Sequence, residues 1–163
     1  TTVQVANELN DIPNPPGAYG SPAWLKGDEA LLIYDRYDIW AVDHNNAEPP
    51  LNLTIDGRLT NTSYRIKRFD LNYRGEQKGI DKSTDVLLSG HNDVTRHDGY
   101  YRFSLKKSNA PKELISVPCM IGRRILNAKD EDVYVFTFRE SVPSQEQCQV
   151  EVIPGLGALL VHG

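Results

Sequence analysis

Short apolar runs separated by polar turns dominate the pattern along the chain. Five such runs are rich in β-branched and aromatic residues and are bounded by Gly, Asp, Asn or Pro: Ala30–Tyr34, Tyr37–Val42, Asp85–Ser89, Tyr100–Leu105 and Asp132–Phe138. This composition and length are typical of β-strands. No longer window repeats with the helical period, and only Asn127–Asp132 is compatible with a helical turn. The pattern therefore predicts an all-β protein.

The alternation inside two runs indicates how each strand is buried. Tyr101, Phe103 and Leu105 alternate with polar residues, as in a strand with one buried face. In Val133–Phe138 the apolar residues occupy both alternating sets of positions. We expect that strand to be covered on both faces.

The two ends of the chain differ from its middle. Residues 1–18 contain Pro13, Pro15, Pro16 and Gly17, which disfavour both a helix and a central strand. We expect an extended N-terminal segment over 1–18 and the β-sheets over 19–163. Residues 72–82 are predicted to form a loop or a hairpin tip, and the apolar tail 155–161 a terminal strand.

A weak internal repeat groups the runs into sets. Each copy has an apolar strand, an aromatic strand and a short final strand. The copies are Leu31–Tyr34 with Tyr37–Asp43 and Leu51–Thr54, then Val86–Ser89 with Gly99–Leu105 and Glu113–Ile115, and finally Val133–Phe138 with Cys148–Ile153. A spacing of about 45 to 60 residues suits four-stranded propeller blades. The fold expected is about three antiparallel sheets arranged as consecutive blades, an incomplete β-propeller.

The first copy carries a specific motif. Ser21-Pro22-Ala23-Trp24, a Lys26-Gly27-Asp28 turn, Asp38-Ile39-Trp40-Ala41-Val42-Asp43 and Leu53-Thr54 resemble the TolB-type propeller repeat. The resemblance implies that Trp24 packs between blades and that Asp43 ends a strand in a turn. The structural motif residues are Ser21, Pro22, Trp24, Asp38, Trp40 and Asp43. Trp24 and Trp40 are expected to be largely buried.

A second resemblance is closer. Tyr19–Trp24, Tyr34–Asp43, Asn52–Thr54, Gly57-Arg58 and Tyr64-Arg65 are similar to one blade of the propeller in secreted bacterial peptidases of the prolyl oligopeptidase family. Asn127–Asp130 with Val135–Phe138 resembles a later blade of that propeller. The resemblance spans roughly residues 10–150 and is densest over 19–65. It implies a secreted or periplasmic protein whose propeller gates or filters the access of peptides.

The chain lacks the catalytic half of that family. It contains no Gly-x-Ser-x-Gly elbow, and Ser21, Ser104 and Ser141 have no such context. We therefore expect a non-catalytic propeller segment, not an enzyme by itself, with no cofactor. The alternative is a stand-alone periplasmic TolB-like module for binding or scaffolding.

The number of blades predicts a partner. A closed propeller has typically about four to eight blades, whereas the repeat supplies about three. We expect the remainder of a parent chain, or self-association, to cover the open blade edges. The resemblance adds peptides as a further partner.

Charge and hydropathy exclude two other classes of partner. The net charge of −4 argues against nucleic acid, whose phosphates select basic proteins. Hydrophobic residues make up 39% of the chain, and no run approaches the roughly 20 apolar residues of a membrane helix.

Two polar clusters have open interpretations. His91, Asp93 and His97 are either weak metal-ligand candidates on a hairpin or part of an exposed loop with Asp98-Gly99 as a turn. Asp35, Arg36 and Asp38 form either a Ca²⁺ or substrate-amine contact or a hairpin turn. In the turn, the carboxylates would accept hydrogen bonds from Arg36 and local amides.

The remaining candidates are aromatic residues and cysteines. One aromatic set either lines a glycan or peptide surface or packs inside the blades: Tyr34, Tyr37, Trp40, Tyr100, Tyr101 and Phe103. Cys119 and Cys148 either form a disulfide across neighbouring strands or remain two buried thiols. We expect two thiols.

Overall fold

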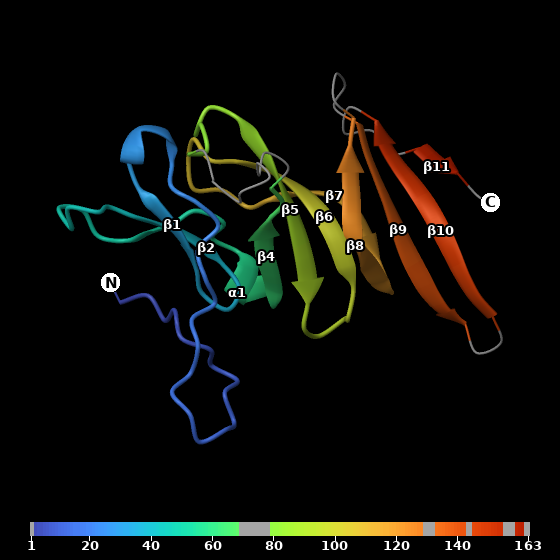
Figure 1. Ribbon diagram of the computed structural model, residues 1–163, viewed down its shortest axis with the longest axis horizontal. Coiled ribbons are helices and arrows are strands. Elements are labelled where there is room, and N and C mark those ends of the chain that lie inside the picture. Colours follow the sequence, from blue (N-terminus) through green and yellow to red (C-terminus); the bar gives the residue numbers. More distant parts are fainter. Residues whose placement is uncertain (1, 69–78, 129–132, 143–144, 155–158, 162–163) are drawn as a thin grey trace.

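The computed structural model describes residues 2–68, 79–128, 133–142, 145–154 and 159–161, with side chains described as far as Phe136 except at 122–124 and 127. Its strands form three antiparallel sheets (Figure 1). Sheet 1 contains β1 (Leu31–Tyr34), β2 (Ile39–Val42) and β3 (Leu51–Asn52). Sheet 2 contains β4 (Thr62–Ile66), β5 (Asp85–Asn92), β6 (Asp98–Ser104) and β7 (Lys112–Val117). Sheet 3 contains β8 (Met120–Asn127), β9 (Val133–Val142), β10 (Gln145–Pro154) and β11 (Leu159–Val161).

Within each sheet the strands follow one another in chain order. Every pair of neighbouring strands is antiparallel. Sheet 1 gains a further extended segment, because Trp24 forms a bridge with Leu31 and the Leu32 amide donates to the Ala23 carbonyl. Each sheet is thus a meander built from one continuous stretch of chain, which explains why the sequence repeat was visible.

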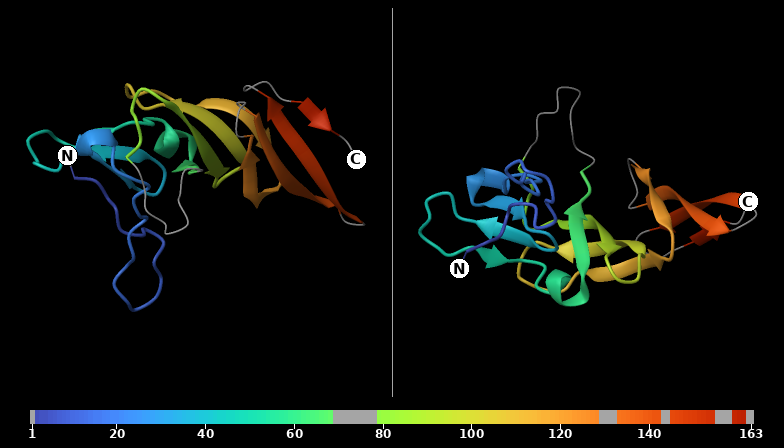
Figure 2. Two further views of the ribbon diagram at one scale, coloured as in Figure 1. Left: turned by 45° about the horizontal axis from the view of Figure 1, so that its top comes forward. Right: turned by 90° about the horizontal axis from the view of Figure 1, so that it is seen from below.

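The three sheets follow one another along the molecule, with sheet 2 between the other two (Figures 1 and 2). A core between sheets 1 and 2 includes Leu32, Ile39, Leu88 and Phe103, all at most 1% exposed. A second, smaller core joins sheets 2 and 3. It contains Leu87, Tyr100, Cys119 and Phe136. Sheet 2 therefore contributes apolar side chains to a core on each of its two faces.

Two short helical turns connect the strands. A 3-10 turn, η1, spans Lys26–Asp28, and Gly27 within it has φ of 76°. The helix α1 spans Gly57–Thr60. No helix in the described residues is long and apolar enough to cross a membrane. The Lys26–Asp28 turn was predicted, whereas α1 is too short to leave a helical period in the sequence.

The all-β prediction is confirmed, and each of the five apolar runs lies in or overlaps a strand. The prediction missed β8. Gly122, Arg123 and Arg124 interrupt its apolar alternation, and the pairing with β9 shifts register between Ile121 and Ile125. The suggested helical turn at 127–132 is wrong at its start, since Asn127 ends β8. Residues 129–132, and most of the predicted loop at 72–82, lie outside the described residues.

The predicted burial of the two tryptophans is wrong for Trp24, which is 40% exposed. Trp40 is half-buried. Both residues lie on the face of sheet 1 that points away from sheet 2, and the Trp24 ring meets the His44 ring edge-on at 6.2 Å between centroids. Other members of the aromatic set are buried: Tyr34, Tyr37, Tyr100 and Phe103. Their burial favours packing over a ligand-binding surface.

The register of sheet 3 separates the two cysteines. Cys119 is buried and directly precedes β8, while Cys148 lies in β10 opposite Arg139 of β9. Met120 pairs with the same Arg139 from the other side. Two strand spacings, roughly 9.5 Å, exceed the Cα separation that a disulfide allows. The sequence suggested that the two cysteines could lie on neighbouring strands, but β9 separates them. The side chain of Cys148 lies outside the described ones.

Candidate functional site

The turn between β1 and β2 is organised by two buried carboxylates. Asp35 accepts hydrogen bonds from the amides of Tyr37 and Asp38, as the hairpin-turn interpretation predicts. Asp38 is 2% exposed and accepts from the Thr54 hydroxyl at 2.7 Å and from the amides of Gly57 and Arg58 at 2.9 and 3.2 Å. These bonds use both oxygens of Asp38. Asp38 is therefore a poor candidate for a Ca²⁺ ligand, because both of its oxygens already accept hydrogen bonds from the chain itself.

Arg36 does not pair with either carboxylate of its own turn. Its guanidinium donates to Asp93 at 2.6 Å, and the Tyr37 hydroxyl donates to the same oxygen at 3.1 Å. Burial raises the pKa of Asp93, but the bonds from Arg36 and Tyr37 outweigh it and leave that pKa below its usual value. This ion pair connects sheet 1 to the β5–β6 hairpin of sheet 2.

Arg58 and Arg65 complete the connections around this turn. Arg58 binds the Glu8 carboxylate through two nitrogens and lies over the Tyr37 ring, so it attaches the N-terminal segment to sheet 1. Arg65 donates to the carbonyls of Asp35 and Arg36 and lies 4.6 Å from the centroid of Tyr34. The three arginines Arg36, Arg58 and Arg65 thus bind carboxylates and carbonyls of the chain itself, which indicates that they stabilise the fold.

The three metal-ligand candidates point to different partners. His91 Nδ1 lies 2.6 Å from Asp98 Oδ1, while Asp93 binds Arg36 and Tyr37. His97 lies 3.4 Å from the Ser116 hydroxyl and borders a hollow on the opposite face of sheet 2. Among the described residues no group of three His, Cys, Asp or Glu is placed to hold a metal. Asp98 and Gly99 belong to β6, so the predicted turn at these residues is wrong.

A row of Ser63, His91 and Asp98 crosses β4, β5 and β6 on one face of sheet 2. The hydrogen-bonded His91 and Asp98 resemble the base and orienting acid of a hydrolase. The Ser63 hydroxyl, however, donates to the backbone carbonyl of His91 at 3.3 Å. A nucleophile must be hydrogen-bonded to the ring of its base, and no such bond is found here among the described residues.

Ser21, Ser104 and Ser141, the serines considered as nucleophiles from the sequence, show no catalytic arrangement in the described residues. The Ser21 hydroxyl donates to the Leu32 carbonyl and so fixes the extended segment against β1. Ser104 ends β6, and the side chain of Ser141 lies outside the described ones. Pro22 is buried beside this segment. Asp43 directly follows β2 and accepts hydrogen bonds from the amides of Asn45 and Ala47.

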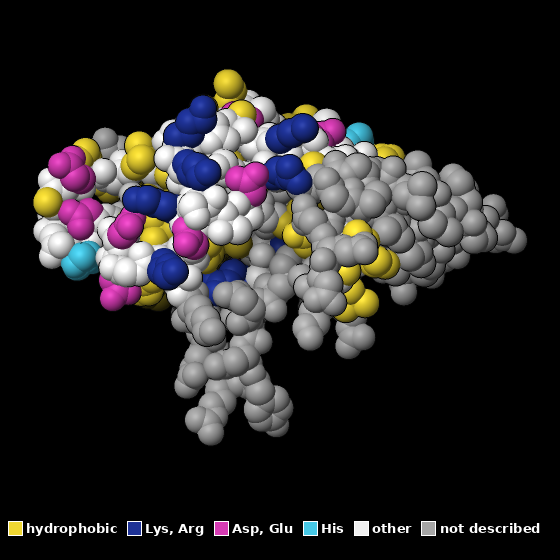
Figure 3. Space-filling view, turned by 90° about the horizontal axis from the view of Figure 1, so that it is seen from above, with side chains coloured by type: hydrophobic (Ala, Val, Ile, Leu, Met, Phe, Trp, Pro, Cys, Tyr) yellow, Lys and Arg dark blue, Asp and Glu magenta, His cyan; other side chains and the backbone are white. Residues whose placement is uncertain are grey.

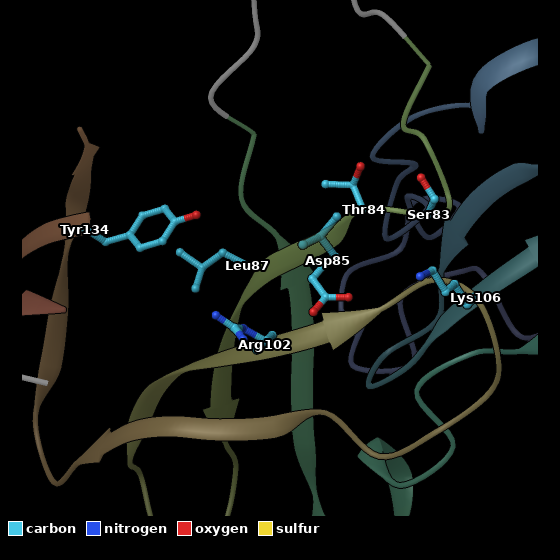
Figure 4. A pocket seen from close by; sticks show the side chains of 8 residues that line it. Ser83, Thr84, Asp85, Leu87, Arg102, Lys106 and Tyr134 are labelled. Atoms are coloured by element: carbon cyan, nitrogen blue, oxygen red, sulfur yellow. The ribbon is translucent and has the colours of Figure 1, made fainter. Parts of the chain in front are cut away.

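A hollow with a cavity volume of about 510 Å³ lies between sheets 2 and 3. Figure 4 shows Asp85 and Arg102 on adjacent strands of sheet 2, with Tyr134 of β9 on the other side. Ser83, Thr84 and Lys106 complete the polar side of the hollow. Two cations and one carboxylate therefore face a space large enough for a small polar ligand.

A smaller hollow of about 210 Å³ lies on the same face of sheet 2. Lys67 borders it, and burial lowers the pKa of this lysine. The Tyr100 hydroxyl, which also borders it, is buried and has no hydrogen-bond partner among the described residues. Burial, and then the Asp98 charge, raise the pKa of Tyr100 to about 12, so this hydroxyl stays protonated. Both hollows were missed by the sequence analysis, because they arise from the stacking of distant strands.

One face of the molecule carries charges of both signs. In Figure 3, Lys and Arg side chains are interspersed with Asp and Glu side chains on the part of the face that is coloured. Comparison of the chain with family models, with curated proteins and with solved structures found no match.

Proposed function

We propose that the chain is a non-catalytic propeller segment of a secreted prolyl-oligopeptidase-like peptidase, in which it gates or filters the access of peptides. The observation that carries the proposal is the succession of three antiparallel meanders, each built from one stretch of chain and stacked on the next. Consecutive four-stranded sheets packed face to face are the building plan of a β-propeller.

The motif residues support the same proposal. Asp38 binds the amides at the start of α1, just before the first strand of sheet 2. The Ser21 hydroxyl binds the Leu32 carbonyl of β1, and Asp43 begins the turn after β2. In this proposal Asp38, Ser21 and Asp43 connect one blade internally or to the next, and none of the three acts on a substrate.

The gating role is tested on the whole protein that contains this segment. We expect the coding sequence to continue into a hydrolase domain with a Gly-x-Ser-x-Gly elbow. Removing residues 19–163 from that protein should increase the hydrolysis of long peptides relative to short ones, because a filter has been lost. An unchanged ratio, in a variant that still cleaves short peptides, would contradict gating.

The segment itself should be inactive. In the chain of 163 residues we expect no hydrolysis of peptidyl or ester substrates. Turnover that is abolished by a serine-directed covalent inhibitor would contradict this expectation, and loss of that turnover in Ser63→Ala would identify Ser63 as the nucleophile.

The hollows between sheets 2 and 3 favour the second candidate, a stand-alone periplasmic TolB-like binding module. A coding sequence without a hydrolase domain would select it. Ligand binding in the larger hollow would then be weakened by Arg102→Ala, while Arg96→Ala, in the β5–β6 turn, would serve as the control.

A further inference from the structure

The hollow of about 210 Å³ on sheet 2 is bordered by two polar groups that the fold leaves unpaired. The first is the hydroxyl of Tyr100, a residue that is 1% exposed. This hydroxyl makes no hydrogen bond with the described residues, although buried hydroxyls are normally paired. Burial raises its pKa to about 12, so it keeps its proton at neutral pH. Tyr100 therefore offers an unused donor to a molecule in the hollow.

The second group is the Lys67 ammonium. Lys67 directly follows β4, is half-buried and borders the same hollow. Its ammonium forms no hydrogen bond or ion pair with the described residues. Burial lowers the pKa of this lysine, because its charge is poorly hydrated there, and the charge of Asp98 acts against that effect. An anion that entered the hollow would stabilise the charge of Lys67.

The other polar side chains around the hollow already bind the chain itself. Asp98 is the one acid among the described residues that border it. Asp98 Oδ1 lies 2.6 Å from His91 Nδ1, and Asp98 Oδ2 accepts from the Ile121 amide at 2.9 Å. Three further side chains at its edge donate to backbone carbonyls: Ser63, Arg65 and Ser89. The unused capacity of the hollow therefore consists of the two donors, Tyr100 and Lys67.

We propose that this hollow binds the carboxylate of a small organic acid. Two unused donors, one of them a cation, match a group that has two acceptor oxygens and no proton to donate. Lys67 and Arg65 outnumber Asp98 at its edge, so the local charge also favours an anion. The hollow could hold several water molecules of about 30 Å³ each, but it is smaller than the sites of about 300 to 1,000 Å³ that take drug-sized ligands. The acid is therefore a small one.

The test is a titration of the 163-residue chain with acetate and with butyrate at constant ionic strength, followed by NMR of the isoleucine methyl groups. Ile121 borders the hollow and reports binding, whereas Ile39 lies in the other core and is the internal control. We expect the Ile121 signal to shift with a dissociation constant of about millimolar order, because ligands of few atoms bind weakly. Acetamide and butyramide have the same shape without the charge and should cause no shift at the same concentrations.

Two variants each remove one donor. Tyr100→Phe loses only the hydroxyl, and Lys67→Met keeps a long side chain without its charge. Each should weaken acetate binding by about tenfold or more, because a hydrogen bond to a charged group is lost. Lys112→Met is the matched control, since Lys112 is exposed in β7 and does not border the hollow. Far-UV circular dichroism identifies variants that remain folded.

Four results would overturn the proposal: no shift of the Ile121 signal, an equal shift with the amides, an equal shift of Ile39, or binding that Tyr100→Phe or Lys67→Met leaves unchanged. Inorganic phosphate that binds more tightly than acetate would also overturn the assignment to a carboxylate. The comparison of acetate with acetamide needs no variant, so the proposal can fail even if a variant does not fold. The inference does not use the peptidase resemblance, and its failure would leave the proposed gating role as it stands.

Discussion

At the scale of single residues, Asp38 holds the turn before β2 together with the start of α1. Its carboxylate is 2% exposed and accepts hydrogen bonds from Thr54, Gly57 and Arg58. The space around it is also tight. A Cβ atom at Gly57 would lie 2.6 Å from Asp38 Oδ1. Glycine is required there by this close approach to a buried charge.

The first prediction concerns this carboxylate. Asp38→Ala should lower the free energy of unfolding by about 3 kcal/mol or more, because several buried donors lose their acceptor. Asp38→Asn keeps one oxygen and should have a smaller effect. Chemical denaturation measures both. If the alanine variant loses less than about 1 kcal/mol, a typical net hydrogen bond, the network is not structural.

The second prediction concerns pH and Asp93. The pKa of Asp93 is lowered in the folded protein, so its pairing stabilises the fold above the ordinary Asp pKa, about 3.9, and this contribution is lost as pH falls through the folded value. Asp93→Asn should cost about 1 kcal/mol near neutral pH, since the side chain is 30% exposed.

Denaturation between pH 6 and pH 3 checks the sign of this effect. The difference between the parent protein and Asp93→Asn should shrink as the pH falls. Asp85→Asn, at the exposed start of β5, is the control and should show little difference at any pH. A difference for Asp93→Asn that does not vary with pH would mean that its charge has no role.

At the scale of elements, the β5–β6 hairpin depends on a pair of glycines. Gly90 and Gly99 face each other across the strands, and a Cβ at Gly90 would lie 2.5 Å from the Tyr101 ring. The same ring packs edge-on against Tyr64 at 5.1 Å between centroids. The aromatic ring thus covers a part of the hairpin that has no side chains of its own.

The third prediction follows from this contact. Gly90→Ala should destabilise the protein by about 1 to 3 kcal/mol, the usual cost of overpacking. Gly17→Ala is the matched control, because a Cβ there meets nothing within 4 Å. Thermal or chemical denaturation compares the two variants. Equal stabilities would show that the Tyr101 ring does not lie over the glycine.

Much of the element pattern could be predicted from the sequence, and the failures have local causes. β1, β2 and β6 were visible because apolar residues dominate them. The end of β5 was not, since Gly90, His91 and Asn92 are weak strand formers that pair because Thr62–Tyr64 and β6 lie beside them. Such tertiary effects do not appear in a local pattern.

The candidate site was harder to predict than the strands. Asp43 begins the turn after β2 and accepts hydrogen bonds from amides two and four residues further along, so the local sequence was enough to suggest a turn there. The partner of Arg36 is 57 residues away along the chain and is selected by the packing of sheets 1 and 2. The hollow around Arg102 and Tyr134 likewise requires the placement of sheet 3 beside sheet 2. These features depend on stacking that a single sequence does not encode locally.

At the scale of the whole molecule, successive sheets pack face to face. Between sheets 2 and 3, the rings of Tyr100 and Phe136 meet edge-on at 4.8 Å between centroids. Both side chains are 1% exposed. Their contact, unlike those inside one sheet, exists only if β9 lies over sheet 2.

A double-mutant cycle on Tyr100 and Phe136 tests directly whether sheets 2 and 3 pack face to face. Tyr100→Leu, Phe136→Leu and the double variant are compared by chemical denaturation at one protein concentration. We expect a coupling free energy of about 0.5 to 1.5 kcal/mol, typical of an edge-on aromatic pair. A coupling free energy of zero within error would contradict the face-to-face packing of the sheets.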